Sequence, residues 1–230
     1  MNKYAFFDVD YTIYNGYSTN DFNLFLVDIG VCPVSIKEKN EELVELYNSG
    51  KIDYTEASNR VVALQAEAIK GLTSEKVIEL GDEFVSKDAK LFPFVKDLFK
   101  LLEEKDFQIY LISAAASPCV EAIARLLETD KYFASELEIK ANKYTGEVSQ
   151  MLNNQEKKHA IHRVMGHLSK NSLKLGFGDS TGDIEMLSSV DHAFVINPHQ
   201  DQIKQIAKEN NWSLVTSDNI ISEVRKTLDI

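Results

Sequence analysis

The chain has 230 residues, of which 44% are hydrophobic and 27% are charged, a balance typical of a globular protein and not of a fibre, a disordered tail or a membrane bundle. Its 36 acidic residues outnumber its 25 basic ones and give a formal net charge of −11, so the long-range electrostatic field repels nucleic acid. No apolar run reaches the roughly 18 residues that cross a bilayer, and the first apolar stretch has no signal-peptide cleavage site. Because two cysteines are too few for a disulfide framework, we expect a cytoplasmic protein with reduced thiols and no membrane partner.

Short apolar runs bounded by turn residues predict buried strands, and in chain order these are residues 4–8, 108–113, 173–178 and 193–197. Segments with helical spacing lie between them, at residues 94–105, 118–128 and 155–168. A loose alternation over residues 137–148 predicts a small hairpin that turns around Tyr144, Thr145 and Gly146. The alternation of strand and helix predicts an α/β fold, a Rossmann-like, doubly wound parallel sheet with ligands at the carboxyl ends of its strands.

The interval of residues 14–87 breaks this alternation, because it contains no convincing strand. Its spacing predicts four consecutive helices instead, at residues 19–29, 36–48, 53–69 and 73–86. We therefore expect an inserted α-helical cap domain at residues 14–87. The core domain would consist of residues 1–13 and 88–230.

The strongest chemical signal is the segment AFFDVDYT, in which an apolar strand leads directly to Asp8 and Asp10. Side chains two residues apart in an extended strand share one face, and two carboxylates so close repel each other unless a cation or a shared proton compensates. A strand that ends in a polar turn often carries one Asp. Two make that alternative weak.

A second acidic pair, Asp179 and Asp183, follows a later strand in the segment GFGDSTGD. Because parallel strands end at one edge of a sheet, this pair should converge with the first pair, and such an all-oxygen cluster suits a hard cation such as Mg²⁺. A cap on the following helix is the alternative role for these residues. The glycines of the segment are expected to let the backbone turn tightly: Gly176, Gly178 and Gly182.

Two weaker signals lie between the acidic pairs. In LISAAASP a strand ends at Ser113, whose hydroxyl, with the N–H groups that follow from Ala114 on, could hold an anion, although a plain turn is the commoner reading. A lysine at the start of the helix before GFGDS could pair with an anionic substrate and with the carboxylates. Lys157 lies above the apolar stripe of that helix and is our choice, with Lys158 as the reserve and a solvated surface lysine as the alternative.

In this order (DxDxT, then Ser, then Lys, then GDSxxD), the motifs resemble the haloacid dehalogenase-like hydrolase superfamily over nearly the whole chain. The helical insert between the first two motifs, the YTGEV segment and the late VINP run are similar to the phosphoserine-phosphatase-like branch. The resemblance implies a Mg²⁺-dependent phosphatase that acts on a small phosphorylated metabolite.

By that resemblance Asp8 would be the nucleophile that forms an aspartyl-phosphate intermediate. Asp10 would be the general acid and base, and its presence favours a phosphatase or phosphomutase over a dehalogenase. The Asp8 side chain, the Asp10 backbone carbonyl and Asp179 would hold Mg²⁺, and Asp183 would complete or support that site.

The remaining motif residues would serve the phosphoryl group and the loop around it. By the same resemblance Ser113, Ala114 and Lys157 would bind the phosphoryl oxygens. Thr12 would brace the loop that carries Asp10.

The chain departs from the phosphoserine-phosphatase-like pattern where that branch binds its substrate. Tyr17 stands near the position of a Glu that meets the amino group of phosphoserine, and Arg60 is only an approximate match for a cap Arg that binds its carboxylate. Phosphoserine is therefore a doubtful substrate. Tyr11, with Tyr14 and Tyr17, could line the entrance and stack a flat ring or hold a quaternary amine, while packing under the cap is the alternative.

Two other functions stay open at this stage. A phosphotransferase or phosphomutase would pass the phosphoryl group to an acceptor other than water. A non-catalytic phosphate-binding module, such as a receiver domain, would carry its phosphorylated Asp on a middle strand of a shorter chain, which argues against it here. The sequence leaves the oligomeric state open.

Overall fold

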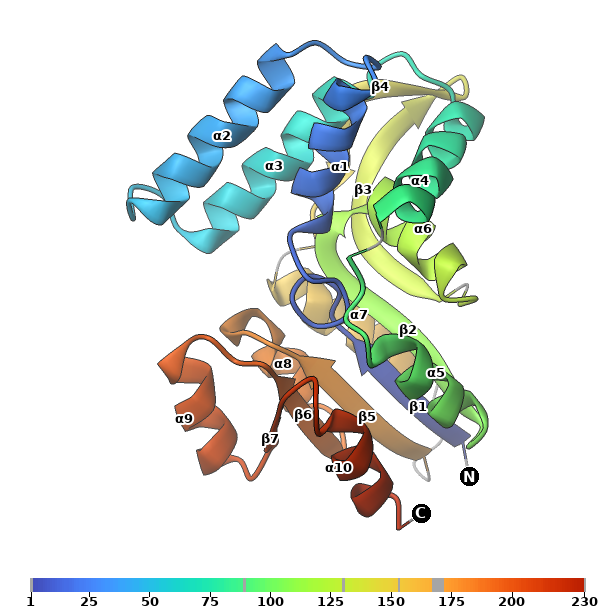
Figure 1. The fold of residues 1–230 in the computed structure, drawn as a ribbon, viewed down its shortest axis with the longest axis vertical. Helices are drawn as coiled ribbons and strands as arrows, with labels where there is room; N and C mark the ends of the chain where they lie inside the picture. The colour runs from blue at the N-terminus through green and yellow to red at the C-terminus, as the bar shows by residue number, and fades with distance from the viewer. Residues whose placement is uncertain (1, 89, 130, 153, 167–171, 230) are drawn as a thin grey trace.

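The computed structural model describes residues 2–88, 90–129, 131–152, 154–166 and 172–229, and in these residues a seven-stranded sheet runs through the molecule (Figure 1). The strand order is β4-β3-β2-β1-β5-β6-β7. All neighbouring strands are parallel except β3 and β4, which form an antiparallel hairpin. The predicted α/β fold with a parallel sheet is thus confirmed. The strands are β1 Asn2–Phe7, β2 Phe107–Ala116, β3 Tyr132–Lys140, β4 Lys143–Gln150, β5 Ser172–Gly178, β6 His192–Ile196 and β7 Ser213–Val215.

Strand β1 is central because it is apolar on both faces. Phe6 and Phe7 point to opposite sides of the sheet, as successive strand residues do, and each belongs to a different hydrophobic cluster. Phe7 lies beside Leu111 of β2 and Phe177 of β5 in the parallel register, and the rings of Phe7 and Phe177 stack with their centroids 4.2 Å apart. Burial on both faces fixes where β1 ends, and therefore where Asp8 stands.

Helices cover both faces of the sheet. The Phe7 face packs against residues of α5, α6 and α10, and the Phe6 face packs against residues of α7, α8 and α9. Their bounds are α5 Val95–Glu103, α6 Ser117–Leu126, α7 Asn154–Gly166, α8 Ile184–Leu187, α9 Asp201–Glu209 and α10 Ile220–Thr227. None of the helices in the described residues is long and apolar enough to span a bilayer.

The four helices expected between the first two motifs are present. They are α1 Ser18–Asp28, α2 Ser35–Asn48, α3 Tyr54–Ala68 and α4 Ser74–Asp88. Helix α3 packs against β4 and α4 packs against α6, so the four helices flank the β3–β4 hairpin at the top of Figure 1. Backbone hydrogen bonds from Gly71 to Tyr144 and from Tyr144 to Leu72 join the α3–α4 connection to the hairpin.

The structure corrects two local expectations. Strand β2 does not end at Ser113 but continues to Ala116, with a shift in its register against β3 after Ile112. The hairpin turns at Ala141 and Asn142, which both have positive φ, and not around Tyr144–Gly146, where the chain is already in β4. In both places the local sequence allows either reading, and pairing with the neighbouring strand decides between them.

The sequence analysis missed the last elements of the chain. It assigned no structure after β6, where the chain forms α9, the three-residue strand β7 and α10. A strand of three residues is too short to show alternation, so β7 is defined by its pairing with β6.

Both cysteines, Cys32 and Cys119, are buried free thiols.

Candidate active site

The ends of β1 and β5 bring the first and last motifs together. The two strands are parallel neighbours, and the N–H of Asp8 donates a 2.9 Å hydrogen bond to the carbonyl oxygen of Phe177, just before the GDSTGD turn. Asp179 follows the end of β5, and Asp183 ends the short 3₁₀ helix η1 (Thr181–Asp183). Residues more than 170 positions apart in the chain thus meet at one edge of the sheet.

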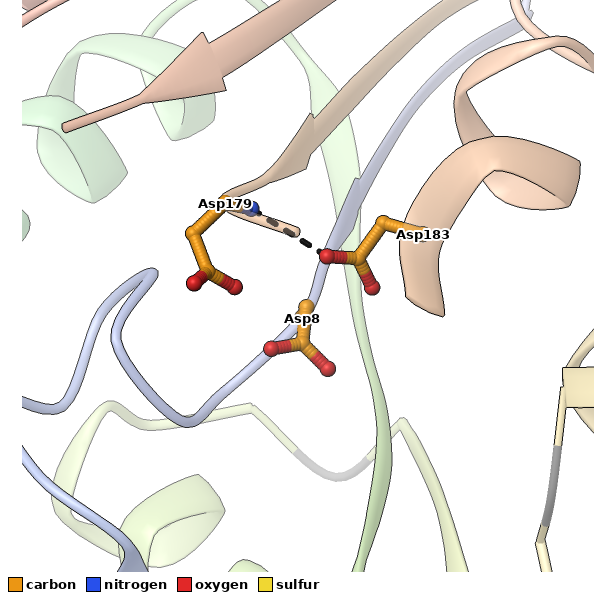
Figure 2. A group of neighbouring side chains, drawn as sticks. All are labelled: Asp8, Asp179 and Asp183. Carbon is orange, nitrogen blue, oxygen red and sulfur yellow. Dashed lines mark hydrogen bonds between the residues drawn. The ribbon is translucent and has the colours of Figure 1, made fainter. Parts of the chain in front are cut away.

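Three carboxyl groups face one another at this edge (Figure 2). One oxygen each from Asp8, Asp179 and Asp183 lies within 4.8 Å of the other two. Asp8 and Asp183 are buried. The sequence analysis expected Asp183 to converge with Asp8 and Asp179, and the structure places its carboxyl group beside theirs.

Lys157 supplies the positive charge inside this cluster. It lies on α7 and is only 6% exposed, and its Nζ donates 2.7 Å to Asp8 Oδ1 and 3.1 Å to Asp183 Oδ1. Because a buried charge is stable only when paired, this contact accounts for burying a lysine there. The reserve candidate, Lys158, has a side chain that lies outside the described part of the structure.

Burial and the neighbouring charges together raise the pKa values of Asp8, Asp179 and Lys157. Burial, followed by the charge of Asp183, raises the pKa of Asp8 to about 7 although Lys157 acts in the opposite direction. Burial and the neighbouring carboxylates raise the pKa of Asp179 well above 3.8. Burial disfavours the charged form of Lys157, but Asp183 and Asp8 outweigh it and raise its pKa well above 10.5. The single ammonium group of Lys157 therefore cannot neutralise all three carboxylates of the cluster.

The second oxygen of Asp183 organises the loop after β5. Asp183 Oδ2 accepts hydrogen bonds from the N–H of Asp179 (3.1 Å) and from the N–H and hydroxyl of Ser180 (both 3.2 Å). Ser180 and Asp183 form a reciprocal capping box at the start of η1. The helix-capping alternative considered for this segment is thus also realised, by Ser180 and Asp183, and Asp179 is left facing the cluster.

Gly178 is required by close approach and not by a turn. The chain bends at Asp179 and Ser180 before η1, as expected, but none of Gly176, Gly178 and Gly182 has a positive φ, so this turn does not depend on the conformational freedom of glycine. A Cβ built on Gly178 would lie 2.6 Å from the Cβ of Asp183, which is closer than real contacts allow. Glycine at this position lets Asp183 reach Lys157.

Asp10 stands beside the cluster in the loop after β1. The loop curls around the carbonyl oxygen of Val9, which accepts hydrogen bonds from the N–H groups of three successive residues, Thr12, Ile13 and Tyr14. Asp10 is half-buried, and its Oδ1 accepts a 2.9 Å hydrogen bond from the N–H of Ser18, the first residue of α1. Burial is the main cause that raises the pKa of Asp10 to about 6, while the bond from Ser18 lowers it.

Thr12 and Ser113 are both buried at this edge. The hydroxyl of Thr12 has no hydrogen-bond partner among the described residues, so the loop is braced by backbone N–H groups and not by that side chain. Ser113 lies two residues beyond the partner of Phe7, on the extension of β2 next to β1. Its Oγ accepts a 3.2 Å hydrogen bond from the N–H of Ala115, and the carbonyl oxygen of Ala114 accepts one from Ser135.

The tyrosines near the first motif take different positions. The rings of Tyr11 and Tyr17 meet edge to face with centroids 4.9 Å apart at the mouth of a cleft that also contains Asp10 and Asp179. Tyr14 is fully buried instead, and its hydroxyl donates to Asp21. Arg60 is exposed on α3, paired with Glu56, and is not among the residues that line this cleft.

The sequence analysis missed Tyr47 and Tyr54, which line the same cleft from α2 and α3. Burial at its phenol group and the charges of Asp10, Asp8 and Asp183 raise the pKa of Tyr54 well above 10.0, with Lys157 acting in the opposite direction. The charges of the acidic cluster therefore act on the phenol group, although the side chain is 40% exposed at the cleft. No motif marks either tyrosine, because their position depends on how the helices dock.

The family model described as haloacid dehalogenase-like hydrolase matches residues 5–188. Phosphoserine phosphatase SerB1 of Mycobacterium tuberculosis (strain ATCC 25618 / H37Rv) is 27% identical over 219 residues, covering 91% of this chain and 69% of that protein. A protein of unknown function from Bordetella pertussis Tohama I superimposes with a TM-score of 0.77 at 21% identity, over 94% of this chain and 98% of the other. A substrate-bound phosphoserine phosphatase superimposes with a TM-score of 0.63 at 18% identity, over 99% and 98%. At these identities the two solved structures show a shared fold.

Gly178→Ala tests the close approach of Asp183. We expect the added methyl group to lower the free energy of unfolding by about 1–3 kcal/mol, as overpacking does, and to displace Asp183. The cluster could hold a metal ion, and the affinity for Mg²⁺ expected from the sequence, measured by calorimetry on the folded variant, should fall. The matched control is Gly176→Ala on the same strand, whose new methyl group meets Val190 and not the acidic cluster, so stability should fall while metal affinity is kept. Equal metal affinity in the two variants would contradict this account.

Proposed function

Because this chain belongs to the haloacid dehalogenase-like hydrolase family, we propose that it is a Mg²⁺-dependent phosphatase that hydrolyses a small phosphomonoester through an aspartyl-phosphate on Asp8. The observation that carries the proposal is the buried arrangement of Asp8, Asp183 and Lys157 at the end of β1, with Asp179 facing it. Similarity to proteins named phosphoserine phosphatase supports the phosphatase class.

The donor set of the cluster fits a magnesium ion. Carboxylate oxygens are the ligands that this hard cation prefers. Three carboxylates beside a single lysine also leave negative charge that a bound cation would neutralise. Asp8 and Asp179 would hold the ion with the backbone carbonyl of Asp10, and Asp183 would support it. When bound, the ion would offset the repulsion between the carboxylates and a phosphate dianion.

Asp8 would attack the phosphorus atom. A bond would form between an Asp8 carboxylate oxygen and phosphorus, and the bond from phosphorus to the ester oxygen would break. Asp10 would give its proton to that leaving oxygen. In the second half, Asp10 would take a proton from water as the water attacks the aspartyl-phosphate, which releases inorganic phosphate and restores Asp8.

The environment of Asp10 suits this acid and base role. Its pKa, raised to about 6 mainly by burial, allows the carboxyl group to be protonated far more readily than an ordinary Asp. The hydrogen bond from Ser18 holds one of its oxygens, and the side chain lies in the cleft where a leaving group would emerge.

Other residues at the edge of the sheet would bind the phosphoryl oxygens. Lys157 already donates to Asp8 and would offset the charge that develops there, and Ser113 with the N–H of Ala114 would contact the transferred group. Helices α1–α4 would form a cap domain of residues 14–87 over a core of residues 1–13 and 88–230. The clefts between them would admit a small phosphorylated metabolite.

Asp8→Asn should lower kcat by roughly 10⁴-fold or more, because an amide is not a nucleophile toward phosphorus. The fold should survive, since Lys157 keeps its partner Asp183. Phosphate release from a panel of metabolite phosphates measures the effect. The matched control is Asp191→Asn at a surface pair with Lys174, which should keep full activity. Substantial activity of Asp8→Asn would refute the role of Asp8.

Removal of divalent metal by a chelator should abolish phosphate release, and added Mg²⁺ should restore it. The same panel run with added alcohols separates hydrolysis from transfer, because a phosphotransferase would yield new phosphate esters. Full activity in the presence of chelator would contradict the metal requirement. If most of the phosphoryl groups are transferred to the added alcohol and not to water, the protein is a phosphotransferase and not a hydrolase.

Asp10→Asn should slow turnover of alkyl phosphates by about 10²–10⁴-fold, because their alkoxide leaving groups need a proton. An aryl phosphate with an acidic phenol leaves without that proton, so formation of the aspartyl-phosphate from it should slow by roughly tenfold at most. The burst of phenol in rapid-mixing experiments measures this step. An equal loss in that step for both substrates would show that Asp10 does not act as the acid.

A further inference from the structure

We infer, on the basis of the phosphatase proposed above, that the substrate's leaving group is uncharged and apolar, and that it occupies a pocket between α1, α2 and α3. This pocket begins at Asp10 and extends between the three helices to Ala115 of β2. Because Asp10 would protonate the leaving oxygen, the group attached to that oxygen extends into the space next to Asp10.

The wall of the pocket is apolar. Helices α2 and α3 and strand β2 contribute aliphatic side chains: Leu43, Val44, Ala57, Val61, Val62 and Ala115. The polar residues along it are neutral, namely Thr19, Asn20 and Ser58. Water in contact with such a wall is readily displaced by an alkyl or aromatic group.

Among the described residues that line the pocket, none is a basic residue that could pair with an anionic leaving group. Of the described residues that line the pocket, Asp10 is the single charged one, and no Lys or Arg is among them. Arg60, two residues from Ser58 on α3, is exposed and paired with Glu56. A leaving group with a carboxylate, such as serine, would lose hydration there without gaining a partner.

Three tyrosines connect this pocket to the cleft that contains Asp179. Tyr17, Tyr47 and Tyr54 line both spaces together with Asp10, and the rings of Tyr47 and Tyr54 meet edge to face with centroids 6.3 Å apart. The passage from the acidic cluster to the apolar wall is therefore lined by aromatic rings. Such surfaces bind apolar groups and bring no formal charge at neutral pH.

The test is a series of n-alkyl phosphates from ethyl to octyl, compared with phosphoserine and glycerol phosphate, with phosphate release as the readout. We expect kcat/KM to rise by roughly two- to fourfold for each added methylene until the pocket is full, as burial of a methylene predicts. The kcat/KM for phosphoserine should be at least about tenfold lower than that for butyl phosphate, which has a chain of similar length.

Two variants test the pocket itself. Val44→Asp places a carboxylate on its wall at a side chain that is already 41% exposed, so the fold should be kept while the gain with chain length is reduced. Its matched control is Val34→Asp, 62% exposed and outside the pocket, which should retain the gain. Ala57→Phe fills the pocket and should remove the preference for long chains, so that octyl phosphate no longer exceeds ethyl phosphate in kcat/KM.

The outcomes separate this inference from the proposed function. Metal-dependent release from several esters, with no effect of chain length or with phosphoserine preferred, would overturn the apolar leaving group and leave the phosphatase intact. No release from any ester by the folded protein would instead overturn the phosphatase. A gain with chain length that persists in both Val44→Asp and Ala57→Phe would place the leaving group elsewhere.

Discussion

The site depends on one buried interaction, the contact of Lys157 with both Asp8 and Asp183. Three separate segments of the chain must be in place before this ammonium group finds its partners: the end of β1, the start of α7 and the loop after β5. Loss of one member of a buried ion pair costs about 3–5 kcal/mol, because the remaining charge is left without compensation. The three groups therefore depend on one another, and their contact sets the charge of the site.

The acidic cluster is positioned by the strands of the sheet, and the apolar pocket is positioned mainly by the helices. Parallel strands place the acidic residues, and their positions follow from pairing and from burial on both faces. Helices place the tyrosines and the aliphatic wall. Asp10 belongs to both layers, since it follows β1 and accepts a hydrogen bond from the start of α1.

Much of the strand layer could be predicted from the sequence. Residues such as Asp8 directly follow a short buried strand, so the apolar run before them predicts where they lie in the sheet. Tyr47 and Tyr54 could not be found in this way, since they reach the cleft through the docking of α2 and α3. The role of Gly178 was misread for a related reason. Its neighbour, the Cβ of Asp183, is close in space because the chain folds back, and local sequence shows only a glycine.

The bonds of Asp183 affect how substitutions in the cluster can be interpreted. One of its oxygens contacts Lys157, while the other accepts bonds from Asp179 and Ser180 and caps η1. Replacing Asp183 would disturb local folding and ion binding together. The Asp179 carboxylate takes part in none of these loop bonds and faces the cluster, so replacing it would isolate the loss of the ligand proposed for Mg²⁺. Of these two aspartates, Asp179 is the cleaner probe and Asp183 the residue on which the architecture relies.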